Sequence, residues 1–208
     1  VGADRDGQLA GPLDRPGQFF YVPCKGSDAV VAYRLDVRRK ILVEAARVAA
    51  RPGAAPRHID FHPAKALAYV INELDSTMAT YEFEPDKGVL KPLQILPTTP
   101  SSYTGNNTGA EVVVAPSGRF VYGSNRGHNS IATFAIDDKT GLLSSVGWEP
   151  TRGRTPRFFA LDPSGAQLYA ANQGTDTIVV FDVNQATGKL TPTGETVKAM
   201  TPTSIAFK

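Results

Sequence analysis

Four short polar stretches carry residue types that could do chemistry, and their middle residue changes from one stretch to the next. The stretches are Cys24-Lys25-Gly26, Asn72-Glu73-Leu74, Asn125-Arg126-Gly127 and Asn172-Gln173-Gly174. A carboxylate such as that of Glu73 can accept or donate a proton, and a guanidinium such as that of Arg126 binds carboxylate or phosphate through paired hydrogen bonds. If the fold brings these stretches together, they would form a site for a small anionic molecule.

A second group of charged residues lies at a fixed distance from a recurring tyrosine. Each of three stretches begins thirteen residues before a tyrosine: Pro56-Arg57-His58, Gly109-Ala110-Glu111 and Pro156-Arg157-Phe158. We therefore expect that Arg57, His58, Glu111 and Arg157 could approach Glu73 and Arg126. The alternative is that each arginine pairs with an acid of a neighbouring unit. His58 follows Arg57 directly, so in a strand its side chain should point to the opposite face and pack between units.

A histidine and one loop complete the candidate residues. His128 could serve as a second base, because imidazole titrates near neutrality, or it could be a turn residue bonded to backbone. Tyr103, in the loop 97–109, could lie over a ligand, or the loop could be a surface excursion. Three scattered histidines do not make a transition-metal site, and we expect no cofactor. The predicted catalytic residues are Glu73, Arg57, Arg126 and His128, and the predicted substrate-binding residues are Arg157, Glu111, Gln173 and Tyr103.

A repeat indicates the elements that must position these residues. Four tyrosines lie 48, 53 and 47 residues apart, and they are Tyr21, Tyr69, Tyr122 and Tyr169. Each is followed twelve positions later by another aromatic residue, and seven positions beyond that comes a lysine in the first unit and a glycine in the other three. A fixed period of this length is typical of a repeated supersecondary unit. The loop 97–109 accounts for the one longer spacing.

Within each unit the apolar residues alternate with period two, as in residues 131–136 and 178–183, and no helical stripe is present. Each unit is therefore predicted to form four short antiparallel strands. Such units are the blades of an all-β fold, the β-propeller, whereas a β-sandwich has no reason to keep identical spacings through four units. The predicted blades span roughly 13–50, 56–97, 109–150 and 156–197 in a single domain over 1–208, and 201–207 would be a closing strand.

Composition narrows the classes of partner. The net charge is +2 with 41% hydrophobic residues, and the basic residues are scattered, which argues against nucleic acid. No apolar run approaches the roughly 20 residues that span a bilayer, so we expect no membrane. Cys24 is the only cysteine, which excludes an intrachain disulfide and fits the cytoplasm. The periplasm stays open, because the chain begins at Val1 and a leader or longer segment could precede it.

Several longer strings occur in a characteristic order: PRHIDFHP, YVINELDST, TGNNTGAEVVVAPSGRFVYGSNRGHNS and TPRFFALDPSGAQLYAANQGTDTIVVF. In order and spacing they closely resemble the β-propeller lactonase family, which holds propeller-type 6-phosphogluconolactonases and carboxymuconate cyclases. The likeness runs from about Leu13 to Phe207. Members of the family have seven blades, so the resemblance implies that this chain holds about four of seven.

The resemblance also implies roles for individual residues. Arg57, Glu73 and Arg126 match positions of the cyclase active site. The family further uses a histidine before the strand equivalent to 19–22, where this chain reads DGQLAGPLDRPGQ without one, and an aspartate where Cys24 stands.

Together these observations favour a lactone hydrolase acting on an anionic sugar-acid lactone. Glu73 would activate water or protonate the leaving group, and Arg57 with Arg126 would hold the anionic group or stabilise the oxyanion. The alternatives are a carboxymuconate-type cyclase using similar residues and a non-catalytic propeller scaffold. The expected partner is a small anionic lactone or carboxylate, and exposed blade faces could support self-association.

Overall fold

The computed structural model describes residues 17–207, and in this part of the chain nearly all regular structure is β-strand. The first sheet consists of β1 (Phe19–Cys24), β2 (Ala29–Asp36) and β3 (Ile41–Ala49). The second consists of β4 (Pro56–Phe61), β5 (Leu67–Asn72), β6 (Thr77–Glu84) and β7 (Val89–Pro97). The third consists of β8 (Thr108–Val114), β9 (Phe120–Arg126), β10 (Ser130–Ile136) and β11 (Leu143–Pro150). The fourth consists of β12 (Pro156–Leu161), β13 (Gln167–Asn172), β14 (Thr177–Val183) and β15 (Leu190–Lys198). Two 3₁₀ helices, η1 (Lys25–Ser27) and η2 (Gln173–Thr175), follow β1 and β13.

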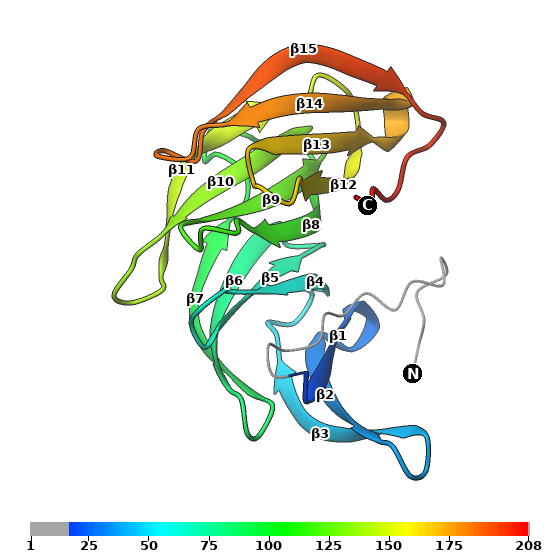
Figure 1. The fold of residues 1–208 in the computed structure, drawn as a ribbon, viewed down its shortest axis with the longest axis vertical. Helices are drawn as coiled ribbons and strands as arrows, with labels where there is room; N and C mark the ends of the chain where they lie inside the picture. Colours follow the sequence, from blue (N-terminus) through cyan, green and yellow to red (C-terminus); the bar gives the residue numbers. More distant parts are fainter. Residues whose placement is uncertain (1–16, 208) are drawn as a thin grey trace.

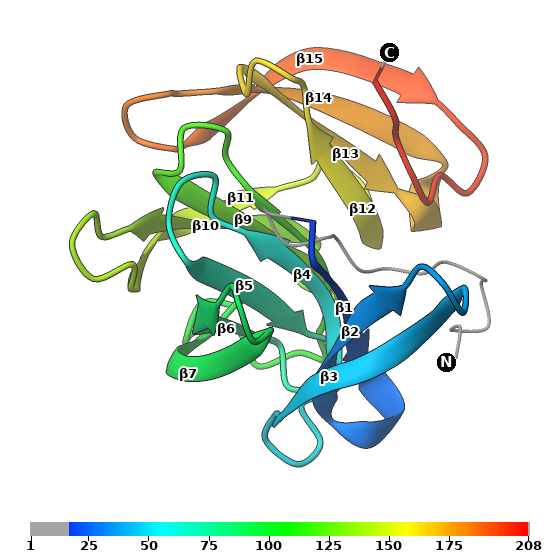
Figure 2. The same ribbon diagram turned by 60° about the horizontal axis from the view of Figure 1, so that its bottom comes forward.

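The four sheets are arranged as propeller blades. Each is antiparallel, with its strands in chain order. Figures 1 and 2 show the sheets side by side in an arc, with β4, β8 and β12 on its inner side and β7, β11 and β15 on its outer side. The predicted all-β fold with four blades is therefore confirmed.

The first blade differs from the prediction of four strands in every unit. Within residues 17–207 it has three strands, in the order β1-β2-β3. Its β1 carries Tyr21, the counterpart of Tyr69 in β5, so β1 corresponds to the second strand of the other blades. The innermost strand predicted for this unit falls before residue 17 and lies outside the described residues.

The repeated glycines stand where the backbone adopts a left-handed conformation. Gly88, Gly141 and Gly188 have φ values of 70°, 72° and 72°, in the turns that precede the outermost strands. Lys40 occupies the same turn of the first blade with a φ of 55°. Glycine adopts this region at no steric cost, which explains the residue found in three of the four turns. At Gly188 an added Cβ would also lie 2.5 Å from the Phe120 ring of the preceding blade.

Two of the repeated tyrosines, Tyr69 and Tyr122, form hydrogen bonds to the turn of the next blade. The Tyr69 hydroxyl donates to Gly141 O at 3.1 Å, and the Tyr122 hydroxyl donates to Gly188 O at 3.0 Å. Both tyrosine side chains are fully buried among the apolar residues between blades. The constant spacing of tyrosine and glycine in the sequence is thus the signature of a contact between neighbouring blades.

Asp60 makes a further connection between blades, close to the inner side of the arc. Its Oδ2 accepts from the Val114 N–H of β8 at 2.7 Å, and its Oδ1 accepts from the Phe61 N–H at 2.8 Å. Burial raises the pKa of Asp60 to about 6, although both amide hydrogen bonds oppose this and the charge of Glu111 adds to it. The folded chain therefore holds this carboxyl in an environment that favours the protonated form.

The segment 201–207 does not form the predicted closing strand, since no strand is assigned to it in the structure. It folds back along the fourth blade, where the Phe207 ring meets the Tyr169 ring edge-on with centroids 5.3 Å apart. A strand needs a neighbouring edge that pairs its backbone groups, and no strand of residues 17–207 pairs with this segment.

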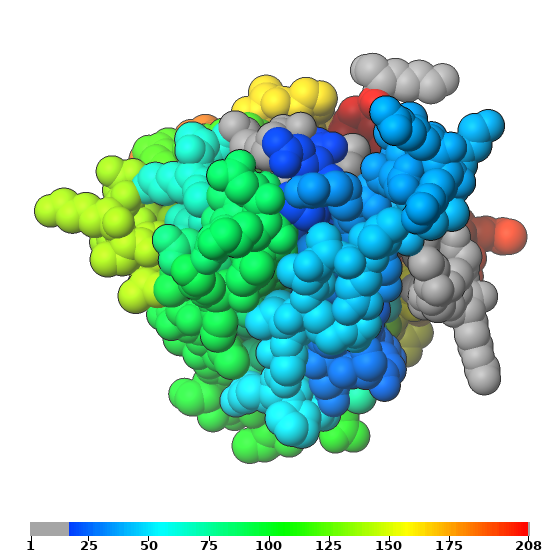
Figure 3. Space-filling view, turned by 90° about the horizontal axis from the view of Figure 1, so that it is seen from below, coloured from blue at the N-terminus to red at the C-terminus, as the bar shows by residue number. Residues whose placement is uncertain are grey.

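The outer surface of the first two blades is continuous. Seen from below, the blue and cyan atoms of the first sheet lie directly against the green atoms of the second (Figure 3).

Exposed apolar side chains gather on β3, namely Ile41, Leu42 and Val43. No helix in residues 17–207 has the length and apolar character needed to cross a bilayer.

We predict that Tyr122→Phe lowers the free energy of unfolding by about 1–2 kcal/mol, because it leaves the buried Gly188 carbonyl without its donor. Tyr169→Phe is the matched control, since among residues 17–207 that hydroxyl donates a hydrogen bond only to Gln167, in its own strand. We expect the control to cost less than about 0.5 kcal/mol. Urea denaturation of both variants measures the difference, and equal losses would show that the contact between blades contributes nothing.

We also predict a pH dependence from Asp60. A carboxyl whose pKa is raised on folding stabilises the folded state while protonated and loses that advantage as pH rises from about 4 through about 6. Asp60→Asn does not ionise, so the stability of this variant relative to wild type should increase by about 1–3 kcal/mol across that window. Any cost of the substitution that is independent of the ionisation of Asp60 cancels when the two pH values are compared. Urea denaturation of both proteins at pH 4 and 7 tests this, and a constant difference would refute the assignment.

Candidate active site

Glu73 is the centre of the candidate site. It lies directly after β5, where its backbone N–H donates to Ala55 O at 2.8 Å. Its side chain is 8% exposed. Lys25 Nζ lies 2.6 Å and Arg126 Nη2 3.1 Å from its Oε1, while Arg57 Nη1 lies 3.1 Å from its Oε2. The structure thus brings together Glu73, Arg57 and Arg126, as their repeat positions predict, and their part in catalysis stays a prediction.

Three neighbouring blades supply these groups from one repeat position. Lys25 opens η1 directly after β1, Glu73 follows β5, and Arg126 is the last residue of β9. Each therefore lies at the end of the second strand of its blade. Because equivalent positions of neighbouring blades open on the same face of a propeller, long side chains from three blades can reach one point.

Arg57 reaches Glu73 because the inner strand of its blade is irregular. The pairing of β4 with β5 shifts between Pro56 and His58, which leaves Arg57 as the extra residue of a bulge. Arg57 Nε donates to Ala110 O at 3.1 Å, and His58 Nδ1 lies 3.0 Å from Glu111 Oε1. Both side chains reach β8, so the expectation that they point to opposite faces is wrong. The bulge breaks the alternation on which that expectation depends.

Arg126 is fixed by contacts of its Nη2 atom, but one of its buried nitrogen atoms is left without a hydrogen-bond acceptor in the described residues. Its side chain is 14% exposed, and its Nη2 also donates to Gly109 O at 3.0 Å. Its Nε is buried and has no hydrogen-bond partner among the described residues. Burial lowers the pKa of Arg126, and the charges of Arg57 and Arg157 lower it further against the opposing effect of Glu73. This guanidinium therefore lies where additional negative charge would be favourable.

The ionisation of Glu73 is decided by its partners. Burial acts to raise the pKa of this carboxyl, but the hydrogen bond from Lys25 and the charges of Arg126, Arg57 and Lys25 together hold it below its ordinary value. Glu73 is therefore a carboxylate at neutral pH. Three cations contact one anion, so the cluster carries an excess of positive charge and can accept an anionic ligand.

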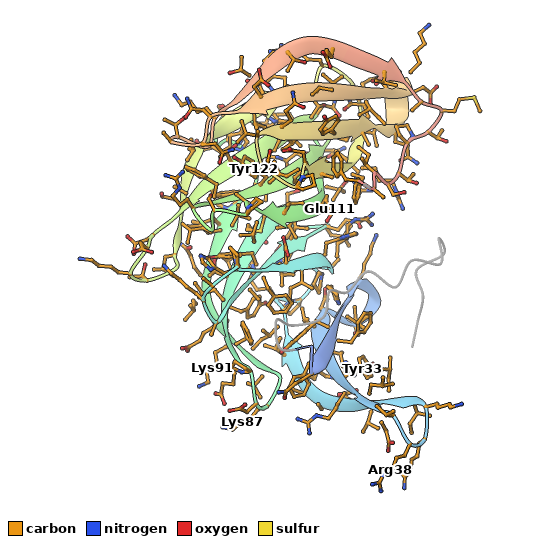
Figure 4. All side chains as sticks on the ribbon, in the orientation of Figure 1. Tyr33, Arg38, Lys87, Lys91, Glu111 and Tyr122 are labelled. Atoms are coloured by element: carbon orange, nitrogen blue, oxygen red, sulfur yellow. The ribbon has the colours of Figure 1, made fainter. Side chains whose placement is uncertain are left out.

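The remaining charged candidates are engaged elsewhere. Glu111 lies on the inner side of the arc, far from Arg38, Lys87 and Lys91 at the lower rim (Figure 4). Its Oε1 accepts from the Val112 N–H at 3.0 Å as well as contacting His58. This carboxylate therefore links β4 and β8 rather than contacting Glu73.

Arg157 and Gln173 come from the fourth blade. Arg157 lies at a bulge of β12 between Pro156 and Phe158, which is the counterpart of the bulge at Arg57. The positive charge of Arg157 lowers the pKa of Arg126. Gln173 opens η2 at the turn equivalent to that of Glu73. No hydrogen bond joins the Gln173 side chain to Glu73 within residues 17–207.

Tyr103 and His128 form a separate group with the inserted loop. Their rings meet edge-on with centroids 4.8 Å apart. His128 Nδ1 lies 2.6 Å from Ser130 Oγ, its backbone N–H donates to Asn107 Oδ1, and burial lowers its pKa. His128 therefore lies in a turn fixed by hydrogen bonds, and no contact between it and Glu73 is found in the described part of the chain.

The asparagines that open three of the four turns are structural. Asn125 and Asn172 are fully buried, and their Nδ2 atoms donate to Thr98 O at 2.6 Å and Thr151 O at 2.9 Å. Each bond joins the second strand of a blade to the segment that follows the last strand of the preceding blade. Among residues 17–207, no group of three or more His, Cys, Asp or Glu side chains could hold a metal ion.

Lys25 is the residue of the cluster that sequence reasoning left unassigned. Its repeat position, shared with Glu73 and Arg126, was the available signal. The signal was incomplete because a lysine stem is flexible, and only the coordinates show that its ammonium reaches Glu73 in the next blade.

Comparisons with known proteins place this arrangement in context. The 6-phosphogluconolactonase of Bacillus subtilis is 38% identical over 137 residues, which is 66% of this chain and 39% of that protein. The 6-phosphogluconolactonase of Serratia proteamaculans is 32% identical over 151 residues, which is 72% of this chain and 45% of that protein. The chain thus spans less than half the length of these relatives.

Solved structures give the same picture. The periplasmic gluconolactonase of Pseudomonas aeruginosa superposes with a TM-score of 0.88 at 30% identity, covering 93% of this chain and 55% of that one. A protein from Lactobacillus plantarum superposes with a TM-score of 0.87 at 31% identity, covering 92% of this chain and 55% of that one. The family described as Lactonase, 7-bladed beta-propeller, matches residues 11–207. The chain therefore belongs to the seven-bladed β-propeller lactonase family.

Proposed function

We propose that this protein hydrolyses an anionic sugar-acid lactone. The observation that carries the proposal is a buried carboxylate, Glu73, surrounded by Lys25, Arg57 and Arg126. Lactone hydrolysis requires a base for the attacking water and a positive charge for the developing oxyanion, and this cluster supplies both. The names of the relatives, 6-phosphogluconolactonase and periplasmic gluconolactonase, support hydrolysis of a sugar-acid lactone, and the first name also supports an anionic substrate.

In this reaction Glu73 transfers the protons, and a guanidinium group stabilises the oxyanion. Water attacks the lactone carbonyl carbon while Glu73 accepts one of its protons, and the oxyanion that forms is stabilised by a guanidinium. The ring C–O bond then breaks, and the departing oxygen takes the proton from Glu73 and leaves as a hydroxyl group. The product is the open-chain sugar acid. Arg57 and Arg126 are suited to the oxyanion because their second hydrogen bonds, to Ala110 O and Gly109 O, fix their orientation.

We predict that Glu73→Gln lowers kcat/KM for 6-phosphogluconolactone by about 10²-fold or more, because the amide cannot accept the proton. Glu84→Gln is the matched control, since Glu84 also pairs with more than one cation, Lys87 and Lys91, and these lie at the lower rim (Figure 4). It should leave the rate within about twofold. The assay follows acid release by the purified chain, with circular dichroism to confirm that each variant is folded. Equal rates for wild type and Glu73→Gln would remove Glu73 from the reaction, and no turnover by wild type would favour a non-catalytic scaffold.

A second prediction concerns the pH dependence. For glucono-δ-lactone, which does not titrate in this range, kcat/KM reports the ionisation of the free enzyme. Because the pKa of Glu73 is held below its ordinary value, the rate should fall only below about pH 4.3, as Glu73 becomes protonated. A decline centred near pH 6 would contradict Glu73 as the base and favour a histidine.

A further inference from the structure

Lys25 differs from the other two cations of the cluster in its freedom to move. Its side chain is 51% exposed, whereas those of Arg57 and Arg126 are 13% and 14% exposed. A lysine ammonium is a compact charge on a flexible stem, and a guanidinium is a rigid planar fork. Exposure and chemistry thus make Lys25 the cation that can change partners most easily.

The hydrogen bonds of the three cations show the same difference. Arg57 and Arg126 are each fixed by a second acceptor, Ala110 O and Gly109 O respectively. The Lys25 ammonium bonds to Glu73 alone within the described residues. When Lys25 leaves, Glu73 keeps two guanidinium partners and stays neutralised. Lys25 can therefore leave Glu73 without exposing a buried charge that has no partner.

The resting cluster is not ideal for the reaction proposed above. The three cations make Glu73 a weak base, because they hold its pKa below the ordinary value. A base works best when its pKa lies near the working pH. Withdrawal of one cation would strengthen the base, and a substrate that attracts Lys25 would bring this about on binding.

We propose that Lys25 is a specificity-determining residue that leaves Glu73 and binds a phosphate, or an equivalent second anionic group, of the substrate. This rests on the proposed function and deepens it, because it assigns selection between phosphorylated and unphosphorylated sugar acids to one side chain. The bound phosphate gains a charge-assisted hydrogen bond, and Glu73 loses one of its three cations. The competing explanation is that Lys25 only ties the first blade to the second.

The test measures binding of two products by calorimetry, 6-phosphogluconate and gluconate, at constant ionic strength. Lys25→Met should weaken binding of 6-phosphogluconate at least tenfold, since a hydrogen bond between charged groups is lost, and should change gluconate binding less than threefold. Lys25→Arg should restore most of the affinity for 6-phosphogluconate. Lys65→Met is the matched control, because Lys65 joins two blades through Asp138. It should affect neither ligand.

Several outcomes would overturn the proposal. Equal losses for the two ligands, or an equal effect of Lys65→Met, would show that Lys25 acts only as a structural tie. No loss in Lys25→Met, or no binding of 6-phosphogluconate to wild type, would show that Lys25 binds no phosphate. Lactone turnover is measured separately, so a catalytically active chain with unchanged ligand selectivity refutes this inference and leaves the proposed function intact. An inactive chain that shows the expected ligand selectivity would refute the proposed function and leave this inference intact.

Discussion

The site depends on keeping a buried carboxylate ionised. Burial disfavours the charge of Glu73, and only the nearby cations reverse this effect. Those cations come from three consecutive blades, so no single sheet could form the cluster. The arrangement of the blades is therefore a condition of the chemistry, because a displacement of one sheet would separate the charges.

The contacts between blades supply the necessary precision. Tyr69 and Tyr122 each donate to the turn glycine of the next blade, and Asp60 holds the β8 backbone near the inner side of the arc. The tyrosine contact occurs at two successive blade boundaries, and the Asp60 contact is partly buried. The residue at the end of each second strand, in contrast, changes from lysine to glutamate, arginine and glutamine. The scaffold thus remains constant where blades meet, and chemical variation is confined to turns that open on one face.

Much of this organisation could be predicted from the sequence, because the responsible contacts recur. The spacing of tyrosine and glycine predicts the blades, because a tyrosine hydroxyl of one blade donates a hydrogen bond to the turn glycine of the next blade. The meeting of Glu73 with Arg126 follows from their shared repeat position. Other features depend on local irregularity that a repeat pattern does not encode. The bulge at Arg57 redirects His58 toward Glu111, and the reach of Lys25 depends on rotamers. The absence of a strand at 201–207 depends on which edge is available, which the residues of that segment do not specify.

A measured pKa of the Glu73 carboxyl would show directly whether the cations keep this buried group ionised. It can be followed by NMR of the purified chain with ¹³C-labelled glutamate, with Glu73→Gln identifying the signal. We expect a titration midpoint below the ordinary value of about 4.3, and a higher midpoint when Lys25 is replaced by methionine. A midpoint at or above the ordinary value would show that burial outweighs the cations, and the site described above would not exist in solution.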